Sequence, residues 1–216
     1  MTRRSRWQGA ALLSMVLAAP VAGAGDSAAD IQARIGAGDP AAGKDKSAMC
    51  QGCHGADGNS AAPNFPKLAG QYADYISKQV IDYQKGVRQD PTMTGMAAAV
   101  ASEQDLHDIA AYFASQKLMK GSGASNDAGR TFYLEGDMAR GIYGCVNCHG
   151  EQGKGKAPDN ALFPVIGGQH KDYLVKQLND LKGRARSNDP AGMMADVARK
   201  MTDEDIAAVA EYLAAQ

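Results

Sequence analysis

Apolar residues recur at helical spacing in two separate stretches of the chain. One helix face is formed by Tyr75, Ile76, Gln79, Val80 and Tyr83 in the first stretch, and by Tyr173, Leu174, Gln177, Leu178 and Leu181 in the second. Further along, similar inward stripes are formed by Leu106, Ile109 and Phe113, and by Ile206, Val209 and Leu213. No stretch shows the alternation of a convincing strand, so the pattern predicts an all-α fold.

Capping residues mark where several of these helices begin. Ser102 with Asp105, and Thr202 with Asp205, have the spacing of a capping box ahead of the last helix in each half. Asp39-Pro40 places a capping residue before a proline suited to the first helical position, which predicts a short helix leading toward Cys50.

The two halves repeat one another at an offset of about 95 to 101 residues. The repeated pieces are 65–71 and 163–169, Asp74-Tyr75 and Asp172-Tyr173, Lys78-Gln79 and Lys176-Gln177, and Asp90-Pro91 and Asp189-Pro190. A polar, Gly- and Ser-rich stretch at 120–126 separates the copies. We therefore predict a first domain over 25–120, a linker over 121–126 and a second domain over 127–216.

The N-terminal segment differs in kind from the rest. Arg3, Arg4 and Arg6 precede an apolar run from Gly9 to Ala22, and small residues follow, which is the layout of a secretory signal peptide. A retained membrane anchor is the alternative, but roughly 14 apolar residues fall short of the roughly 20 that span a bilayer. We expect residues 1–24 to be a signal peptide cleaved near Ala24.

The charge balance excludes one large class of partners. The formal net charge is −1, and removal of the three signal-peptide arginines makes it −4. A mildly acidic chain without a basic cluster is not expected to bind nucleic acid. The mature chain is expected to be soluble outside the cytoplasm, with peripheral membrane attachment left open.

All four cysteines lie in two identical arrangements, Cys50-Gln51-Gly52-Cys53-His54 and Cys145-Val146-Asn147-Cys148-His149. Both have the form C-x-x-C-H, in which each thiol adds to a vinyl group of haem and the adjacent histidine binds the iron. We therefore predict two covalently attached haem c groups, with His54 and His149 as the proximal iron ligands.

Other uses of four cysteines fit less well. Disulfides are common in exported proteins, but with 4 His in 216 residues a histidine after both pairs is improbable by chance. A Cys2His2 zinc site needs a different spacing of its histidines, and a thioredoxin-like pair has no use for the repeated histidine.

The sixth iron ligand decides what such a haem does. An open position admits oxygen or peroxide, whereas methionine closes it and raises the potential. Both halves place a methionine pair after Asp-Pro and before the last helix: Met93 and Met96, then Met193 and Met194. We predict Met93 and Met194 as ligands, with Met96 and Met193 as the alternatives. His107 and His170 do not recur between the copies, so neither is expected to bind iron.

Several neighbouring residues are candidates for the haem surroundings. A ligating histidine usually donates its other ring N–H to a backbone carbonyl, and the carbonyl of Pro63 is predicted to accept it in the first copy. The second copy lacks this proline and would use Ala161, so we expect the two potentials to differ. Gln71, Tyr75, Gln169 and Tyr173 recur and are expected to line the haem or the domain interface. Surface solvation is the expected role of Lys67, Lys78 and Lys176.

The chain resembles the two-haem cytochrome c4 family over essentially its whole mature length. The resemblance rests on the C-x-x-C-H motif followed by 55–60, 62–71, Met93-Thr94-Gly95-Met96 and 108–113, and in the second half on Phe163-Pro164, 167–170 and the Met194 region. It implies a periplasmic protein with tandem class I cytochrome c domains that face each other, their haem propionates meeting near the interface. The methionines aligned with Met93 and Met194 are the distal ligands in that family, although Met93 is one residue further from its last helix than expected. The longer segment between Gly129 and Cys145 is also similar to the family.

The resemblance further implies an electron carrier rather than an enzyme. It points to electron delivery from a quinol-oxidising complex toward a terminal oxidase or another reductase, often with loose membrane association. Two other functions are kept: a cytochrome subunit of a larger oxidoreductase, and a dihaem peroxidase, which the two methionine pairs disfavour.

Domains of roughly 90 residues bury modest cores on their own. Only 6% of the residues are aromatic, so haem supplies much of the apolar mass. We predict that the chain is partly unfolded without haem. Circular dichroism of protein from a strain unable to attach haem tests this, and full native helicity would contradict it.

Overall fold

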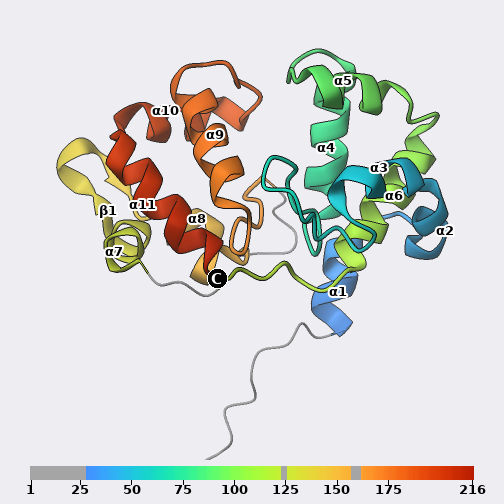
Figure 1. Ribbon diagram of the computed structural model, residues 1–216, viewed down its shortest axis with the longest axis horizontal. Coiled ribbons are helices and arrows are strands. Elements are labelled where there is room, and N and C mark those ends of the chain that lie inside the picture. The colour runs from blue at the N-terminus through green and yellow to red at the C-terminus, as the bar shows by residue number, and fades with distance from the viewer. Residues whose placement is uncertain (1–27, 123–125, 157–161) are drawn as a thin grey trace, which may run out of the picture.

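The computed structural model describes residues 28–122, 126–156 and 162–216. The chain forms two helical bodies that lie side by side, joined by the segment after Ser115 (Figure 1). The first body contains α1 (Ala28–Ile35), α2 (Pro40–Lys46), α3 (Ala48–His54), α4 (Ala73–Gln84), α5 (Pro91–Ala98) and α6 (Glu103–Ser115). The second contains α7 (Asp127–Glu135), α8 (Val146–His149), α9 (Lys171–Lys182), α10 (Met193–Lys200) and α11 (Asp203–Ala214), with short 3-10 turns at Met138–Arg140, Glu151–Gly153 and Pro190–Gly192.

Most of the predicted helix starts are confirmed. The Asp39 side chain accepts a hydrogen bond from the Ala41 amide at 2.8 Å and begins α2. Thr202 and Asp205 form a complete capping box at α11, whereas at α6 only the Ser102 hydroxyl accepts from the Asp105 amide. Helix α1 was not predicted. It packs against α6, and the described part of the second body has no equivalent helix.

The expectation of no strand was wrong at one place. Strands β1 (Gly136–Asp137) and β2 (Ile142–Tyr143) form an antiparallel hairpin, with Gly136 opposite Tyr143 and Asp137 opposite Ile142. Strands of two residues are too short to show alternation. The hairpin occupies the longer segment between Gly129 and Cys145, at the outer edge of the second body (Figure 1).

The same helix crossing holds each body together. In the first, α2 packs on α6, and in the second, α7 packs on α11. A glycine lies at each crossing: a Cβ atom on Gly43 would be 1.9 Å from the Asp108 carbonyl oxygen, and one on Gly129 would be 2.0 Å from that of Ala208. Only a residue without a side chain permits this approach of two backbones.

The bodies also touch each other through buried residues. Ala69, Tyr72, Met119 and Val165 form a small apolar cluster that draws on both repeats. The C-terminus closes on the linker, where the Gly121 amide donates to the Gln216 carbonyl at 2.6 Å. The predicted signal peptide lies outside the described residues, and no helix within them is long and apolar enough to cross a membrane.

We predict that Gly43→Ala destabilises the haem-loaded protein by about 3 kcal/mol, because the helix crossing must open to admit the methyl group. Gly183→Ala is the matched control, since a Cβ there has its nearest neighbour at 3.4 Å. Its effect should lie within about 0.5 kcal/mol. Denaturant unfolding measures both, and equal effects would contradict the prediction.

Candidate haem sites and the surface between them

Each C-x-x-C-H motif lies on a short helix, α3 or α8, that ends at its histidine. All four cysteines have free thiols, so the motifs form no disulfide. Burial raises the pKa of the Cys50 thiol and raises that of Cys145 to about 11. Neither of these two buried thiols is therefore an activated thiolate.

The two motif histidines have matching surroundings. His54 and His149 are about 5% and 6% exposed, and burial lowers the pKa of both rings, so they are neutral. The Nδ1 atom lies 2.8 Å from the Pro66 carbonyl oxygen in the first case and 2.9 Å from that of Pro164 in the second. Because a carbonyl only accepts, Nδ1 carries the proton and Nε2 keeps its lone pair for a metal.

The predicted carbonyl partners, Pro63 and Ala161, were wrong. Pro63 is exposed, and Ala161 lies outside the described residues. The Ser60 hydroxyl is 2.8 Å from the Ala62 carbonyl oxygen and 2.7 Å from that of Phe65, and it folds the intervening loop back on itself. Pro66 and Pro164 are equivalent in the two repeats, so this bond supplies no reason for two different potentials.

The methionine pairs lie on α5 and α10. Asp90 accepts from the Met93 amide at 3.0 Å and caps α5. In the second pair Met193 is 43% exposed and Met194 is half-buried, which favours Met194 as the inward residue. Met93 and Met96 are both half-buried, so burial does not separate them. Two free thiols, a neutral buried imidazole and a methionine helix in each body fit haem c.

Two glutamines join the bodies in a reciprocal way. Gln71 Oε1 accepts from the Val165 amide at 3.0 Å, and its Nε2 donates to the Val165 carbonyl at 2.7 Å. Gln169 does the same with Lys67, at 2.9 Å for both bonds. Since Gln71 matches Gln169 and Lys67 matches Val165 in the repeat, the interface has an approximate two-fold axis.

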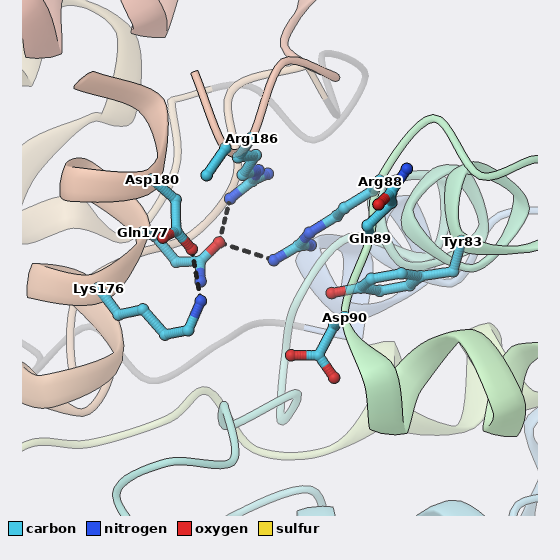
Figure 2. Close-up of a pocket in the computed structure, with 9 residues that line it drawn as sticks. Tyr83, Arg88, Gln89, Asp90, Lys176, Gln177, Asp180 and Arg186 are labelled. Atoms are coloured by element: carbon cyan, nitrogen blue, oxygen red, sulfur yellow. Dashed lines mark hydrogen bonds and ion pairs between the residues drawn. The ribbon is translucent and has the colours of Figure 1, made fainter. Parts of the chain in front are cut away.

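Two arginines, Arg88 buried and Arg186 half-buried, continue this symmetry. Arg88 donates to the Tyr173 hydroxyl at 3.1 Å and to Gln177 Oε1 at 2.7 Å. Arg186 donates to the Tyr75 hydroxyl at 3.1 Å and also reaches Gln177, so both guanidinium groups point at one amide oxygen (Figure 2). Burial opposes ionisation of Tyr75, yet the charges of Arg186 and Arg88 outweigh it and lower its pKa. The two guanidinium groups therefore place positive charge next to the Tyr75 hydroxyl.

The expectation for the recurring Gln and Tyr residues is met by the interface. Gln71, Tyr75, Gln169 and Tyr173 all bond across it. The sequence-based interpretation overlooked Arg88 and Arg186, although they occupy equivalent positions of the repeat.

Surface solvation was the wrong role for two of the three lysines. Lys67 Nζ donates to the Lys120 and Gly168 carbonyls, and Lys78 Nζ donates to the Asn188 carbonyl in the other body. Lys176 pairs with Asp180 on the surface.

The two histidines outside the motifs have other partners. His170 Nε2 lies 2.9 Å from the Ser60 carbonyl oxygen across the interface. His107 Nε2 lies 3.6 Å from a Glu103 carboxylate oxygen on α6.

One buried asparagine breaks the symmetry. Asn188 is buried and donates to Gln79 at 2.9 Å and to the Asp82 carboxylate at 2.7 Å. The first body has no asparagine at this place: Asp90 matches Asp189 in the repeat, and Gln89 before it is exposed, with its amide nitrogen 3.5 Å from the Gly86 carbonyl oxygen. A pocket remains there, lined in part by Asp90, Lys176 and Asp180 (Figure 2).

We predict that Asn188→Asp destabilises the protein by about 3 kcal/mol, because a buried carboxylate would face Asp82 without a proton to donate. Gln89→Glu is the matched control, because it makes the same amide-to-carboxylate change at an exposed side chain of the first body, and no destabilisation is expected. Denaturant unfolding measures both. Destabilisation by the control alone would contradict the prediction.

Comparison with known proteins agrees with these features. The cytochrome c family model matches residues 40–117 and 127–216. Cytochrome c4 of Pseudomonas aeruginosa is 47% identical over 180 residues, which cover 82% of this chain and 88% of that protein. The thiosulfate dehydrogenase electron acceptor of Stutzerimonas stutzeri is 39% identical over 171 residues, which cover 76% and 77%. The crystal structure of reduced recombinant cytochrome c4 from Pseudomonas stutzeri superposes with a TM-score of 0.77 at 43% identity, covering 82% of this chain and 98% of that one.

The predicted fold class and cofactors are thereby confirmed: two cytochrome c domains, each with a C-x-x-C-H motif, carry two covalently bound haem c groups. The chain belongs to the cytochrome c4 family, whose members carry electrons rather than catalyse a reaction.

Proposed function

We propose that the chain is a periplasmic carrier whose two haem irons are both six-coordinate, with His54 and Met93 as axial ligands in the first domain and His149 and Met194 in the second. The observation that carries this proposal is the equivalent hydrogen bond from each buried histidine to a proline carbonyl. It holds Nε2 as a lone-pair nitrogen in both domains. When bound, haem supplies the one-electron ferric and ferrous states.

Closed coordination is what separates a carrier from an enzyme here. A methionine on the distal side leaves no position for oxygen or peroxide. The half-buried Met194 and the half-buried Met93 support this in the two domains. The peroxidase alternative requires a haem iron whose sixth coordination position is open or holds a displaceable ligand. A methionine pair in each domain disfavours this alternative.

The two arginines at the interface support an arrangement in which the haem propionates meet between the domains. Arg88 and Arg186 are charged donors there, and the acceptors of their hydrogen bonds are neutral Gln, Tyr and Asn oxygens. Propionate carboxylates would neutralise these charges. Electrons would then pass between the haems inside one molecule.

We further propose that residues 1–24 direct export, that the domains span 25–120 and 127–216, and that the carrier passes electrons from a quinol-oxidising complex toward a terminal oxidase or another reductase. The likeness to cytochrome c4 proteins, which are periplasmic c-type cytochromes, supports this location. A second candidate is a cytochrome partner or subunit of a larger oxidoreductase. The similarity to thiosulfate dehydrogenase electron acceptors favours it. Co-purification under mild detergent distinguishes a bound subunit from a free carrier.

The test is an optical redox titration of the purified haem-loaded protein, with and without carbon monoxide. We expect two one-electron waves at positive potentials. Carbon monoxide should shift neither potential, because a methionine sulfur occupies the sixth coordination position of each iron. A shift at either haem, or a strongly negative wave, would overturn the ligand assignment for that domain.

Methionine variants locate the ligands. Met194→Ala should remove the sulfur-to-iron charge-transfer band of the second-domain haem and allow that haem to bind carbon monoxide. Met193 is the exposed neighbour, so Met193→Ala should keep the band and should not allow carbon monoxide to bind. Met93→Ala and Met96→Ala make the same comparison in the first domain. Loss of the band in the Met96 variant alone would transfer the ligand role to Met96.

A further inference from the structure

One peptide group stands between each motif histidine and the opposite domain. The Pro66 carbonyl accepts from His54 Nδ1 at 2.8 Å, and the amide N–H of the same peptide, on Lys67, donates to Gln169 Oε1 at 2.9 Å. The second domain repeats the arrangement. The Pro164 carbonyl accepts from His149 Nδ1 at 2.9 Å, and the Val165 N–H of that peptide donates to Gln71 Oε1 at 3.0 Å.

The two hydrogen bonds on each peptide strengthen one another. When the N–H donates to an acceptor, the peptide is polarised and its carbonyl oxygen becomes more negative, so that it accepts more strongly. A stronger acceptor at Nδ1 raises the basicity of the imidazole toward a metal on Nε2. Gln71 and Gln169 are about 4% and 5% exposed, so this polarisation takes place away from water, where it is least screened.

We propose that Gln71 and Gln169 are positioning residues that tune the haem of the opposite domain: Gln169 tunes the haem bound by His54, and Gln71 tunes the haem bound by His149. This inference rests on the proposed ligation of iron by these two histidines. A more basic imidazole stabilises ferric over ferrous iron, so each glutamine lowers the potential of the haem across the interface.

The crossed assignment separates this role from a purely structural one. A glutamine that only holds the domains together would affect both haems alike, or chiefly the haem of its own domain. Gln169 follows the second haem motif in the sequence and belongs to the second domain. The proposal nevertheless predicts that its loss is felt in the first domain.

The experiment compares haem-loaded variants by redox titration followed by proton NMR, in which the haem methyl resonances of each domain titrate separately. Gln169→Leu should raise the potential of the first-domain haem and leave that of the second unchanged. Gln71→Leu should do the reverse. In the reduced protein, the Nδ1 proton of His54 should move upfield in the first variant and that of His149 in the second, because the bond to the carbonyl weakens.

Two further variants serve as controls. Gln169→Glu keeps an acceptor oxygen in either protonation state, so the potential of the first haem should not rise. His170→Leu removes another cross-domain hydrogen bond from the adjacent residue, to the Ser60 carbonyl, without touching the Pro66–Lys67 peptide. It should loosen the interface and leave the potential and the Nδ1 proton of the first domain unchanged.

Equal shifts at both haems in Gln169→Leu, a shift confined to its own domain, or the same shift in His170→Leu would overturn the proposal. If Gln169→Leu does not fold, the reciprocal Gln71→Leu variant carries the same test. Failure of the proposed ligation is distinguishable, because the unmodified protein would then lack the low-spin spectrum of His/Met haem in one or both domains.

Discussion

Burying an imidazole obliges the protein to provide a partner for its N–H, and much of the structure is arranged around that requirement. In each domain the partner is a proline carbonyl at the end of a loop that follows the haem motif. Fixing the carbonyl also fixes the next amide, which then faces the other domain and is satisfied by a glutamine side chain. A local need at the haem motif thus determines where the second domain can pack.

The interface that results combines a small apolar cluster with many hydrogen-bonded polar and charged side chains. Gln71 and Gln169 bond to backbone, and Arg88 and Arg186 bond to hydroxyl and amide oxygens across the boundary. Buried polar groups of this kind stabilise an arrangement only when all of them find partners, which makes the relative orientation of the domains specific. The positive potential of the two arginines also favours anionic groups at the same place.

Much of this was readable from the sequence because it resides in local or repeated patterns. The C-x-x-C-H motifs, the helix starts at Asp39 and Thr202, and the recurrence of Gln71 and Tyr75 all led to the right elements. The partner of His54 was misplaced by three residues, because the direction of a carbonyl depends on how the loop turns and here on the Ser60 hydroxyl. The hairpin at Gly136 to Tyr143 escaped notice because strands so short leave no periodic trace.

Asn188, a buried asparagine with no counterpart in the first domain, illustrates what the fusion of two copies in one chain permits. Two identical subunits related by a two-fold axis must carry every substitution twice, so an amide at one position appears at both. In a single chain the partner is always present at a high effective concentration, and each half is free to change alone. Because the two domains are joined in one chain, their haem environments can differ in sequence, while the contacts that hold the two domains together are kept.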